Sequence, residues 1–259
     1  MDNVSKTRYI PLYGKAHVSR KGIILEDRKA EQIWSAEGFP LRGKAASKWL
    51  AYYMAMRSRV FDDWLCEMLA KEPEATVLHL GCGLDSRCIR VEHAGKQWYD
   101  VDFPDVIRER QRHYEASGNY HMLGADLREE NWLDQIQGDD AVIILEGVSM
   151  YLRHEDLRGL LERLCGRFGK VHLLMDCYTE LAAKLSRRHN PINSVGVTQV
   201  YGLDDPRAAQ WGGLCFLRQH EITPQALIRQ LPAKEQRIFR TLYGGKFADK
   251  LYKLYEYER

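Results

Sequence analysis

The stretch Val77-Leu78-His79-Leu80-Gly81-Cys82-Gly83 joins a short apolar run to a turn that contains two glycines. Residues 76–80 predict a buried strand, and residues 85–92 predict the start of a helix. In open α/β sheets, ligands bind beyond the carboxyl ends of the strands, and glycines in the first strand-to-helix turn let a ligand approach the backbone closely. Gly81 and Gly83 are therefore candidate ligand-binding residues.

This turn differs at one position from the fingerprint of dinucleotide-binding proteins. That fingerprint, G-x-G-x-x-G, requires a third glycine where this chain has Ser86. The difference argues against a ligand with a pyrophosphate, and it leaves room for a ligand with adenosine but no phosphate. S-adenosylmethionine (SAM) is such a ligand.

Short apolar runs alternate with helical patterns through the middle of the chain. Continuous apolar strands that alternate with helices imply a parallel sheet covered on both faces. The pattern therefore predicts a doubly wound, Rossmann-like α/β domain. Its strands are expected at residues 76–80, 97–101, 120–123, 141–145 and 170–175, with helices at residues 104–115 and 155–168.

Acidic residues follow the predicted strands. Asp102 comes about twenty residues after the glycines, where a carboxylate can accept hydrogen bonds from both ribose hydroxyls. Asp126 follows the third strand and can accept from an adenine amino group, while the backbone of Leu127 serves the ring edge. Glu146 ends the fourth strand and would face the ammonium group of SAM. A single acid at a strand end is also typical of a helix cap, but the series favours SAM.

Two cationic residues lie upstream of the predicted sheet. Arg57 and Lys15 could each pair with the carboxylate of the methionine half of SAM. Structural or surface roles are the alternative for both residues.

The two ends of the chain differ from the regular middle. Apolar residues recur at three- and four-residue steps over residues 44–70 and predict an amphipathic helix. We expect residues 1–72 to form an N-terminal helical cap and residues 73–259 to form the SAM-binding domain. Glycines and prolines after the fifth strand predict an inserted lid at about residues 186–216. A helix at residues 224–231 and strands at residues 237–242 and 252–257 are expected to follow.

Composition excludes several classes of protein. The 38 basic and 36 acidic residues nearly cancel and are spread along the chain, which argues against nucleic acid or an anionic membrane as the main partner. No apolar run approaches the length of about 18 residues that a membrane span needs, and the chain starts without a signal sequence. The six cysteines form neither a C-x-x-C pair nor a Cys/His cluster suited to zinc. We therefore expect a cytoplasmic protein without a metal site.

Four ordered motifs resemble those of the leucine carboxyl methyltransferase family, and its bacterial branch of tetracenomycin-type polyketide O-methyltransferases is the most similar. They are LGCGLDSR (80–87), WYDVDFPDVIRER (98–110), GADLRE (124–129) and LEGVSMYL (145–152). Further similarity lies in IPLYGKA (10–16), ILEDRKAEQI (24–33), AMRSRVFDDWL (55–65) and YGLDDPR (201–207). The resemblance therefore covers most of the chain.

The resemblance implies a seven-stranded class I methyltransferase sheet with an antiparallel last strand, and SAM as the methyl donor. Carried over to this sequence, the cofactor contacts of the family fall on Lys15, Arg57, Gly81, Asp102, Asp126, Leu127 and Glu146. His79 departs from the pattern, because many class I methyltransferases have an acidic residue there.

The acidity of the methyl acceptor decides which catalytic groups the protein needs. A carboxylic acid, with a pKa near about 4, is already ionised at neutral pH, whereas a phenol, with a pKa near about 10, benefits from a general base. The histidines lie in no recognisable catalytic arrangement, so we assign no base. Tyr201 and Trp211 could stack on a flat acceptor, or they could anchor the lid to the core.

Three functions remain open at this stage. The first is O-methylation of a small-molecule phenol or carboxylate, in secondary metabolism. The second is methylation of the terminal carboxylate of a protein. The third is a SAM-binding sensor or scaffold without activity. The sequence predicts neither the acceptor nor the oligomeric state.

Overall fold

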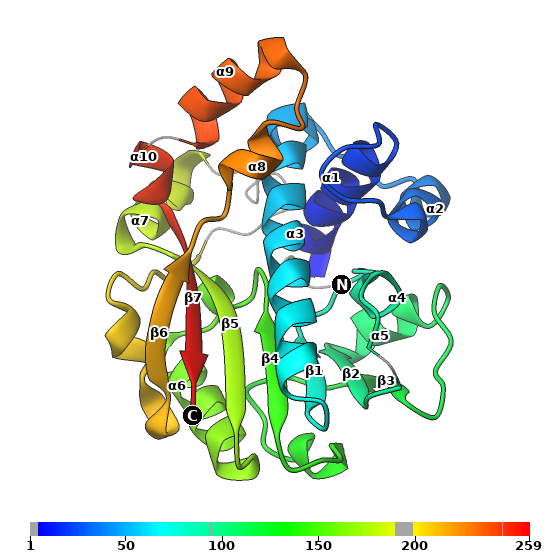
Figure 1. The fold of residues 1–259 in the computed structure, drawn as a ribbon, viewed down its shortest axis with the longest axis vertical. Helices are drawn as coiled ribbons and strands as arrows, with labels where there is room; N and C mark the ends of the chain where they lie inside the picture. The colour runs from blue at the N-terminus through cyan, green and yellow to red at the C-terminus, as the bar shows by residue number, and fades with distance from the viewer. Residues whose placement is uncertain (1–4, 94, 190–198, 245) are drawn as a thin grey trace.

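The computed structural model describes residues 5–93, 95–189, 199–244 and 246–259. A seven-stranded sheet of order β3-β2-β1-β4-β5-β7-β6 forms its centre (Figure 1). β7 runs antiparallel to both of its neighbours, and the other pairs are parallel. The structure thus confirms the doubly wound α/β sheet and its antiparallel last strand. The strands are β1 (Thr76–Leu80), β2 (Trp98–Asp102), β3 (Tyr120–Gly124), β4 (Ala141–Leu145), β5 (Val171–Tyr178), β6 (Cys215–His220) and β7 (Tyr252–Glu258).

Helices cover both faces of this sheet and extend above the carboxyl ends of its parallel strands (Figure 1). The α-helices are α1 (Tyr9–Ser19), α2 (Arg28–Glu37), α3 (Lys48–Lys71), α4 (Arg87–Arg90), α5 (Pro104–Arg110), α6 (His154–Arg167), α7 (Glu180–His189), α8 (Gln225–Ile228), α9 (Ala233–Tyr243) and α10 (Lys246–Asp249). Short 3-10 helices are η1 (Ser5–Arg8), η2 (Gly43–Ala46), η3 (Leu133–Gln135), η4 (Ser149–Tyr151), η6 (Pro206–Ala209) and η7 (Trp211–Gly213). Within the described ranges, every helix is too short or too polar to span a lipid bilayer.

The sixth strand was predicted in the wrong place. Residues 237–242 belong to helix α9, in which Phe239 and Tyr243 stack one helical turn apart with their ring centroids separated by 5.5 Å. Strand β6 instead lies at Cys215–His220, where most residues are exposed. An exposed edge strand lacks a continuous apolar run, so the pattern that located the buried strands could not find it.

The segment between α7 and β6 is shorter than the lid predicted at residues 186–216, because α7 extends to His189 and β6 begins at Cys215. Residues 190–198 lie outside the described part of the chain, and the following residues pack on the core. There, the amides of Tyr201 and Leu203 donate to the carbonyls of Met150 and Tyr178 at 2.8 and 2.7 Å.

Alternate residues of the central strands pack on opposite faces of the sheet. Val77 and Val142 contribute to the core under α1 and α3, whereas their neighbours Leu78 and Ile143 contribute to the core under α6. All five residues of β1 and of β4 are buried. This burial on both faces explains the continuous apolar runs in the sequence.

Helix α3 connects the sheet to the region above it. Its N-cap is Ser47, whose side chain accepts from the amide of Trp49, and the helix runs for 24 residues from Lys48. Its C-terminal half lies along the sheet, and its N-terminal half extends beyond the carboxyl ends of the strands toward α1 (Figure 1). Side chains of this N-terminal half can therefore face any ligand bound at that edge.

A buried ion pair links β2 to α5. Asp100 and Arg110 are both fully buried and form a salt bridge. The Tyr120 hydroxyl and the Trp98 indole also donate to the Asp100 carboxylate, at 2.7 and 2.9 Å. Burial raises the pKa of Asp100, but Arg110, His79 and the Trp98 indole outweigh it and lower the pKa to about 2.

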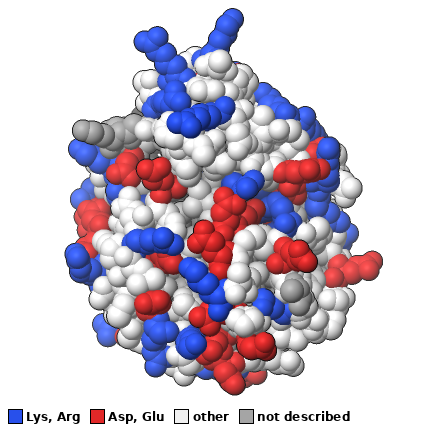
Figure 2. Space-filling model, viewed as in Figure 1, with Lys and Arg blue, Asp and Glu red and all other residues white. Residues whose placement is uncertain are grey.

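On the visible face of the molecule, acidic and basic side chains are interspersed over most of the surface (Figure 2). Basic side chains gather at the top of that view, over α9, which carries Lys234, Arg237 and Arg240.

We predict that Asp100→Asn destabilises the fold by about 3–5 kcal/mol, because it leaves the Arg110 guanidinium buried without a counter-charge. Urea unfolding measures this loss. Asp63→Asn is the matched control, because it breaks the exposed Arg59–Asp63 pair and should change the free energy of unfolding by less than about 1 kcal/mol. Equal losses in the two variants would contradict the structural role of Asp100.

Candidate active site

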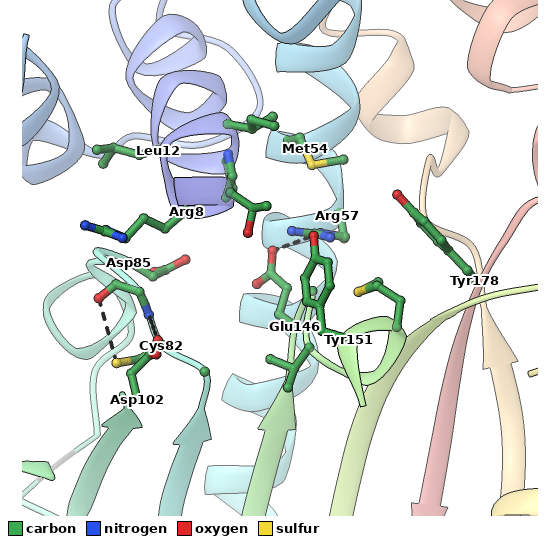
Figure 3. Close-up of a pocket in the computed structure, with 18 of the residues that line it drawn as sticks. Arg8, Leu12, Met54, Arg57, Cys82, Asp85, Asp102, Glu146, Tyr151 and Tyr178 are labelled. Atoms are coloured by element: carbon green, nitrogen blue, oxygen red, sulfur yellow. Dashed lines mark hydrogen bonds and ion pairs between the residues drawn. The ribbon is translucent and has the colours of Figure 1, made fainter. Parts of the chain in front are cut away.

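A cavity of about 650 Å³ lies at the carboxyl ends of the parallel strands. This volume is within the range of about 300–1,000 Å³ that is usual for ligand pockets. Acidic side chains reach it from the turn after β1, from the end of β2 and from the residue after β4, and Tyr151 and Tyr178 lie farther toward β5 and β7 (Figure 3). The cavity therefore has a charged half and an aromatic half.

The glycine turn after β1 forms the floor of the charged half. Gly81 and Gly83 have φ angles of +71° and +52°, which favour glycine. A Cβ atom on Gly81 would lie 2.3 Å from Cγ2 of Val148, so no other residue fits without a shift. The structure thus places both predicted glycines against the cavity and explains why Gly81 is required.

Asp102 lines the cavity at the end of β2. Its two carboxylate oxygens accept from the backbone amides of Phe103 and Gly83 at 2.7 and 2.8 Å. Burial raises the pKa of Asp102, and the two amides oppose this shift. A carboxylate has about four lone-pair sites, so about two remain for a ligand.

Asp126 and Leu127 also line the cavity. The Asp126 carboxylate is occupied by Arg128, which donates to it from its backbone amide and its guanidinium. The Leu127 carbonyl accepts from Arg163 at 2.8 Å, while the Leu127 side chain is buried. An adenine contact from Asp126 therefore requires Arg128 to move.

Glu146 lies between two guanidinium groups. One oxygen accepts from Arg57 at 3.0 Å and from Ser58 at 2.7 Å, and the other accepts from Arg87. Burial raises the pKa of Glu146, but Arg87 and Arg57 outweigh it and lower the pKa to about 2. Glu146 is therefore an anion at any physiological pH, and about one of its lone-pair sites remains open.

Arg57 connects the two halves of the cavity. Its Nη1 donates to Asp176 at 2.9 Å and to the Tyr252 hydroxyl at 2.6 Å, and its Nε donates to Glu146. Its Nη2 has no partner among the residues that the structure describes. A guanidinium that lines the cavity with one free nitrogen can donate two further hydrogen bonds to a ligand.

Lys15 is buried, and its ammonium group pairs with Asp85 at 2.6 Å. Asp85 also contacts Arg90 at 3.2 Å, and Arg90 in turn contacts Asp62 and Asp27. Burial raises the pKa of Asp85, but Lys15, Arg90 and Arg87 outweigh it and hold the pKa well below its usual value. Asp85 belongs to one of the family motifs, yet sequence analysis assigned it no role.

The charged residues beneath the cavity form one connected network. With all members ionised, four cations face five carboxylates, which leaves one net negative charge. The members are Lys15, Arg57, Arg87, Arg90, Asp27, Asp62, Asp85, Glu146 and Asp176.

His79 is a second residue whose role only the structure reveals. Nη1 of Arg87 lies 3.1 Å from its Nε2, and Asp100 Oδ1 lies 3.2 Å from its Nδ1. Because arginine only donates, Nε2 must be the acceptor, which places the ring proton on Nδ1 beside Asp100. His79 thus lies between Arg87 and Asp100, at the position where many class I methyltransferases have an acidic residue.

The aromatic half was not identified from the sequence. Its residues come from α3, η4, β5, α9 and β7, which are far apart in the chain and share no motif. The tyrosines that line it are Tyr53, Tyr151, Tyr178, Tyr243 and Tyr252.

The structure does not bring Tyr201 and Trp211 to the cavity. Neither residue is among those that line it. Tyr201 lies beside His154 with a ring separation of 6.5 Å, and Trp211 packs on the core under α6. Their aromatic rings therefore contact the protein rather than the cavity.

Comparison with known proteins agrees with this site. Residues 12–165, more than half of the chain, match the family described as leucine carboxyl methyltransferase. The chain is 32% identical over 190 residues to the tetracenomycin polyketide synthesis O-methyltransferase TcmP of Streptomyces glaucescens, and the match covers 72% of this chain and 70% of that protein. The chain belongs to the leucine carboxyl methyltransferase family. It is a SAM-dependent methyltransferase.

A second relative agrees with this family, and a solved structure shares the fold. The chain is 28% identical over 231 residues to the S-adenosyl-L-methionine-dependent methyltransferase dpfgK of Gibberella zeae. This match covers 80% of this chain and 78% of that protein. The magnesium protoporphyrin IX methyltransferase of Synechocystis, solved with bound SAH, shares the fold. Its TM-score is 0.53 at 14% identity, with 88% of this chain and 93% of that chain covered.

We predict that Gly81→Ala reduces the affinity of this methyltransferase for SAM by tenfold or more, because the added Cβ forces Val148 to shift and strains the backbone. Calorimetry with SAM measures the change. Val148→Ala removes the clashing methyl groups, so the double variant should recover part of the affinity, and Val148→Ala alone is the control. Wild-type affinity in Gly81→Ala would contradict the close approach of SAM to this turn.

Proposed function

We propose that this methyltransferase transfers the methyl group of SAM to a carboxylate oxygen of a small aromatic molecule. The observation that carries the proposal is the division of the cavity. The charged half has the hydrogen-bonding groups that SAM needs, and the aromatic half is lined by tyrosines and aliphatic residues. Among the described residues that line the aromatic half, none is a histidine, lysine or carboxylate that could act as a base.

The hydrogen-bonding capacity of the charged half supports SAM at this position. The two lone-pair sites left on Asp102 match the two ribose hydroxyls. The free Nη2 of Arg57 suits the methionine carboxylate, and the open site on Glu146 suits the ammonium group. Lys15, held by Asp85 beside them, can add a further donor toward that carboxylate.

The net charge of the network also suits this cofactor. SAM carries a sulfonium and an ammonium against a single carboxylate, so it is a cation overall. Burial raises the pKa of Asp176 and Arg57 opposes this shift; with Asp176 ionised, the network has one excess carboxylate and attracts such a cation. We further propose that adenine lies over Leu127 and displaces Arg128 from Asp126, which costs little because this ion pair is exposed.

The absence of a base among these residues favours a carboxylate over a phenol as the acceptor. A carboxylate has already lost its proton at neutral pH, so the protein has only to orient it. When bound, SAM supplies an electrophilic methyl group on sulfur. One lone pair of the carboxylate forms the bond to the methyl carbon, and the electron pair of the broken bond stays on the sulfur. No proton moves, and positioning alone can supply a large part of the acceleration.

The aromatic lining and one relative together suggest the class of acceptor. Tyrosine rings stack well on flat aromatic molecules. The similar protein TcmP is an O-methyltransferase of polyketide synthesis. We therefore propose an aromatic, polyketide-like acid as the acceptor, within secondary metabolism.

Asp102→Ala should weaken the binding of SAM by about 1–3 kcal/mol, because the ribose hydroxyls lose their hydrogen-bond acceptor. Calorimetry measures this difference. Asp134→Ala, at an exposed position in η3, is the control and should leave the affinity unchanged. Unchanged affinity in Asp102→Ala would refute the ribose contact.

Methyl transfer from radiolabelled SAM to matched acids and phenols tests the acceptor class. We expect 2-naphthoate or anthracene-2-carboxylate to be methylated, at a rate that is constant between about pH 6 and 9 because both acids are fully ionised there. The matched phenol 2-naphthol should react poorly, with a rate that rises with pH. Preferred methylation of the phenol, or a rate with the acids that depends on a group titrating near pH 7, would contradict a carboxylate acceptor.

A further inference from the structure

One tyrosine of the aromatic half has an unused hydroxyl. Tyr53 is only 7% exposed and lines the cavity. Its hydroxyl has no hydrogen-bond partner among the described residues, although it is not sealed from the cavity as the buried unpaired atoms of the core are. Buried hydroxyls are normally hydrogen-bonded, so this one calls for an explanation.

The neighbouring tyrosines do not share this property. The Tyr252 hydroxyl donates to Asp176 at 2.6 Å and accepts from Arg57 at 2.6 Å. Tyr151 is hydrogen-bonded to Thr7. Tyr178 and Tyr243 are only partly buried. Among the described residues that line this cavity, Tyr53 is therefore the deeply buried tyrosine whose hydroxyl is left for a ligand.

Tyr53 lies at the junction of the charged half and the aromatic half of the cavity. It precedes Arg57 by four residues on α3, so the two side chains lie on the same face of the helix, one turn apart. Its ring stacks on that of Tyr252 at a centroid distance of 6.1 Å and packs against Tyr243 at 5.1 Å. These contacts fix the ring, and with it the direction of the hydroxyl.

We propose that the Tyr53 hydroxyl donates a hydrogen bond to the acceptor and orients its carboxylate toward the methyl group. The proposal rests on the carboxylate acceptor proposed above. One carboxylate oxygen forms the new bond to carbon, and the other oxygen needs a hydrogen-bond donor. A neutral donor suits this role, because it holds the anion without removing as much of its electron density as a cation would.

The chemistry of Tyr53 is consistent with a permanent donor. Burial raises the pKa of the Tyr53 phenol well above its usual value of about 10, and the opposing effect of Arg57 is smaller. The hydroxyl therefore keeps its proton at the pH at which an enzyme works. It cannot serve as a base, and its contribution must lie in binding and orientation.

Tyr53→Phe tests the proposal, since it removes the hydroxyl and keeps the ring that packs on Tyr243 and Tyr252. We expect 2-naphthoate to bind the SAH-loaded variant about tenfold or more weakly than the wild type, the range for a hydrogen bond to a charged group. The KM for 2-naphthoate should rise by a similar factor, with a smaller change in kcat. The affinity for SAH should change by less than about twofold, because the cofactor contacts are intact.

Tyr255→Phe is the matched control. Its hydroxyl donates to the carbonyl of Asp204 at 3.3 Å from the opposite face of β7, and it does not line the cavity. The affinities of this variant for 2-naphthoate and for SAH should equal those of the wild type. Circular dichroism and thermal unfolding verify that both variants are folded.

The outcomes separate this proposal from the proposed function. Equal affinity of wild type and Tyr53→Phe for 2-naphthoate overturns the role of Tyr53, even if acids are methylated. Weakened binding without methylation of any acid supports the contact with Tyr53 and overturns the carboxylate reaction. A wild-type protein that binds no 2-naphthoate overturns both.

Discussion

The buried ion pair between Arg87 and Glu146 is the interaction on which the site depends. Arg87 is fully buried and reaches from the helix after β1 to the end of β4. Both strands are central in the sheet, and their carboxyl ends are adjacent because β1 pairs with β4 in parallel. Removing two such charges from water costs several kcal/mol for each ion, so the pair persists only because further partners complete its hydrogen bonding.

These partners make the floor of the cavity a single unit. Arg87 also binds Asp62 of α3, and Glu146 also binds Arg57 of the same helix. His79 accepts from Arg87 and thereby joins the unit to Asp100 and the second strand. Loss of one member would leave a neighbouring charge buried and unpaired. The groups that face the cofactor are consequently held by the same contacts that hold α3 on the sheet.

Helix α3 also sets the positions of the methyl donor and the methyl acceptor relative to each other. Arg57 and Tyr53 lie one turn apart on α3, the first toward the charged half and the second in the aromatic half. A rigid helix fixes the separation of these two side chains. In a displacement reaction, the donor carbon and the acceptor oxygen must be aligned, and such fixed separation serves that alignment.

Local patterns in the sequence determined the sheet, the glycine turn and the acids at the strand ends. A strand buried on both faces must be apolar throughout, and Gly81 must be glycine because its φ is positive and a Cβ would meet Val148. These constraints act on a few neighbouring residues, so they can be read along the chain. The exposed strand β6 and the helix α9 lack such a constraint, and there the pattern failed.

Only the tertiary structure decided which polar groups remain available to hydrogen-bond with a ligand. The sequence places Asp102, Asp126 and Glu146 after three strands but does not show which of their oxygens are already hydrogen-bonded. In the folded protein, Asp126 is occupied by Arg128, Glu146 is held by two guanidiniums, and Asp102 keeps about two free sites. The tyrosines of the aromatic half likewise meet only when five separate elements converge. Hydrogen bonding between distant segments depends on their arrangement in space, and no local pattern records it.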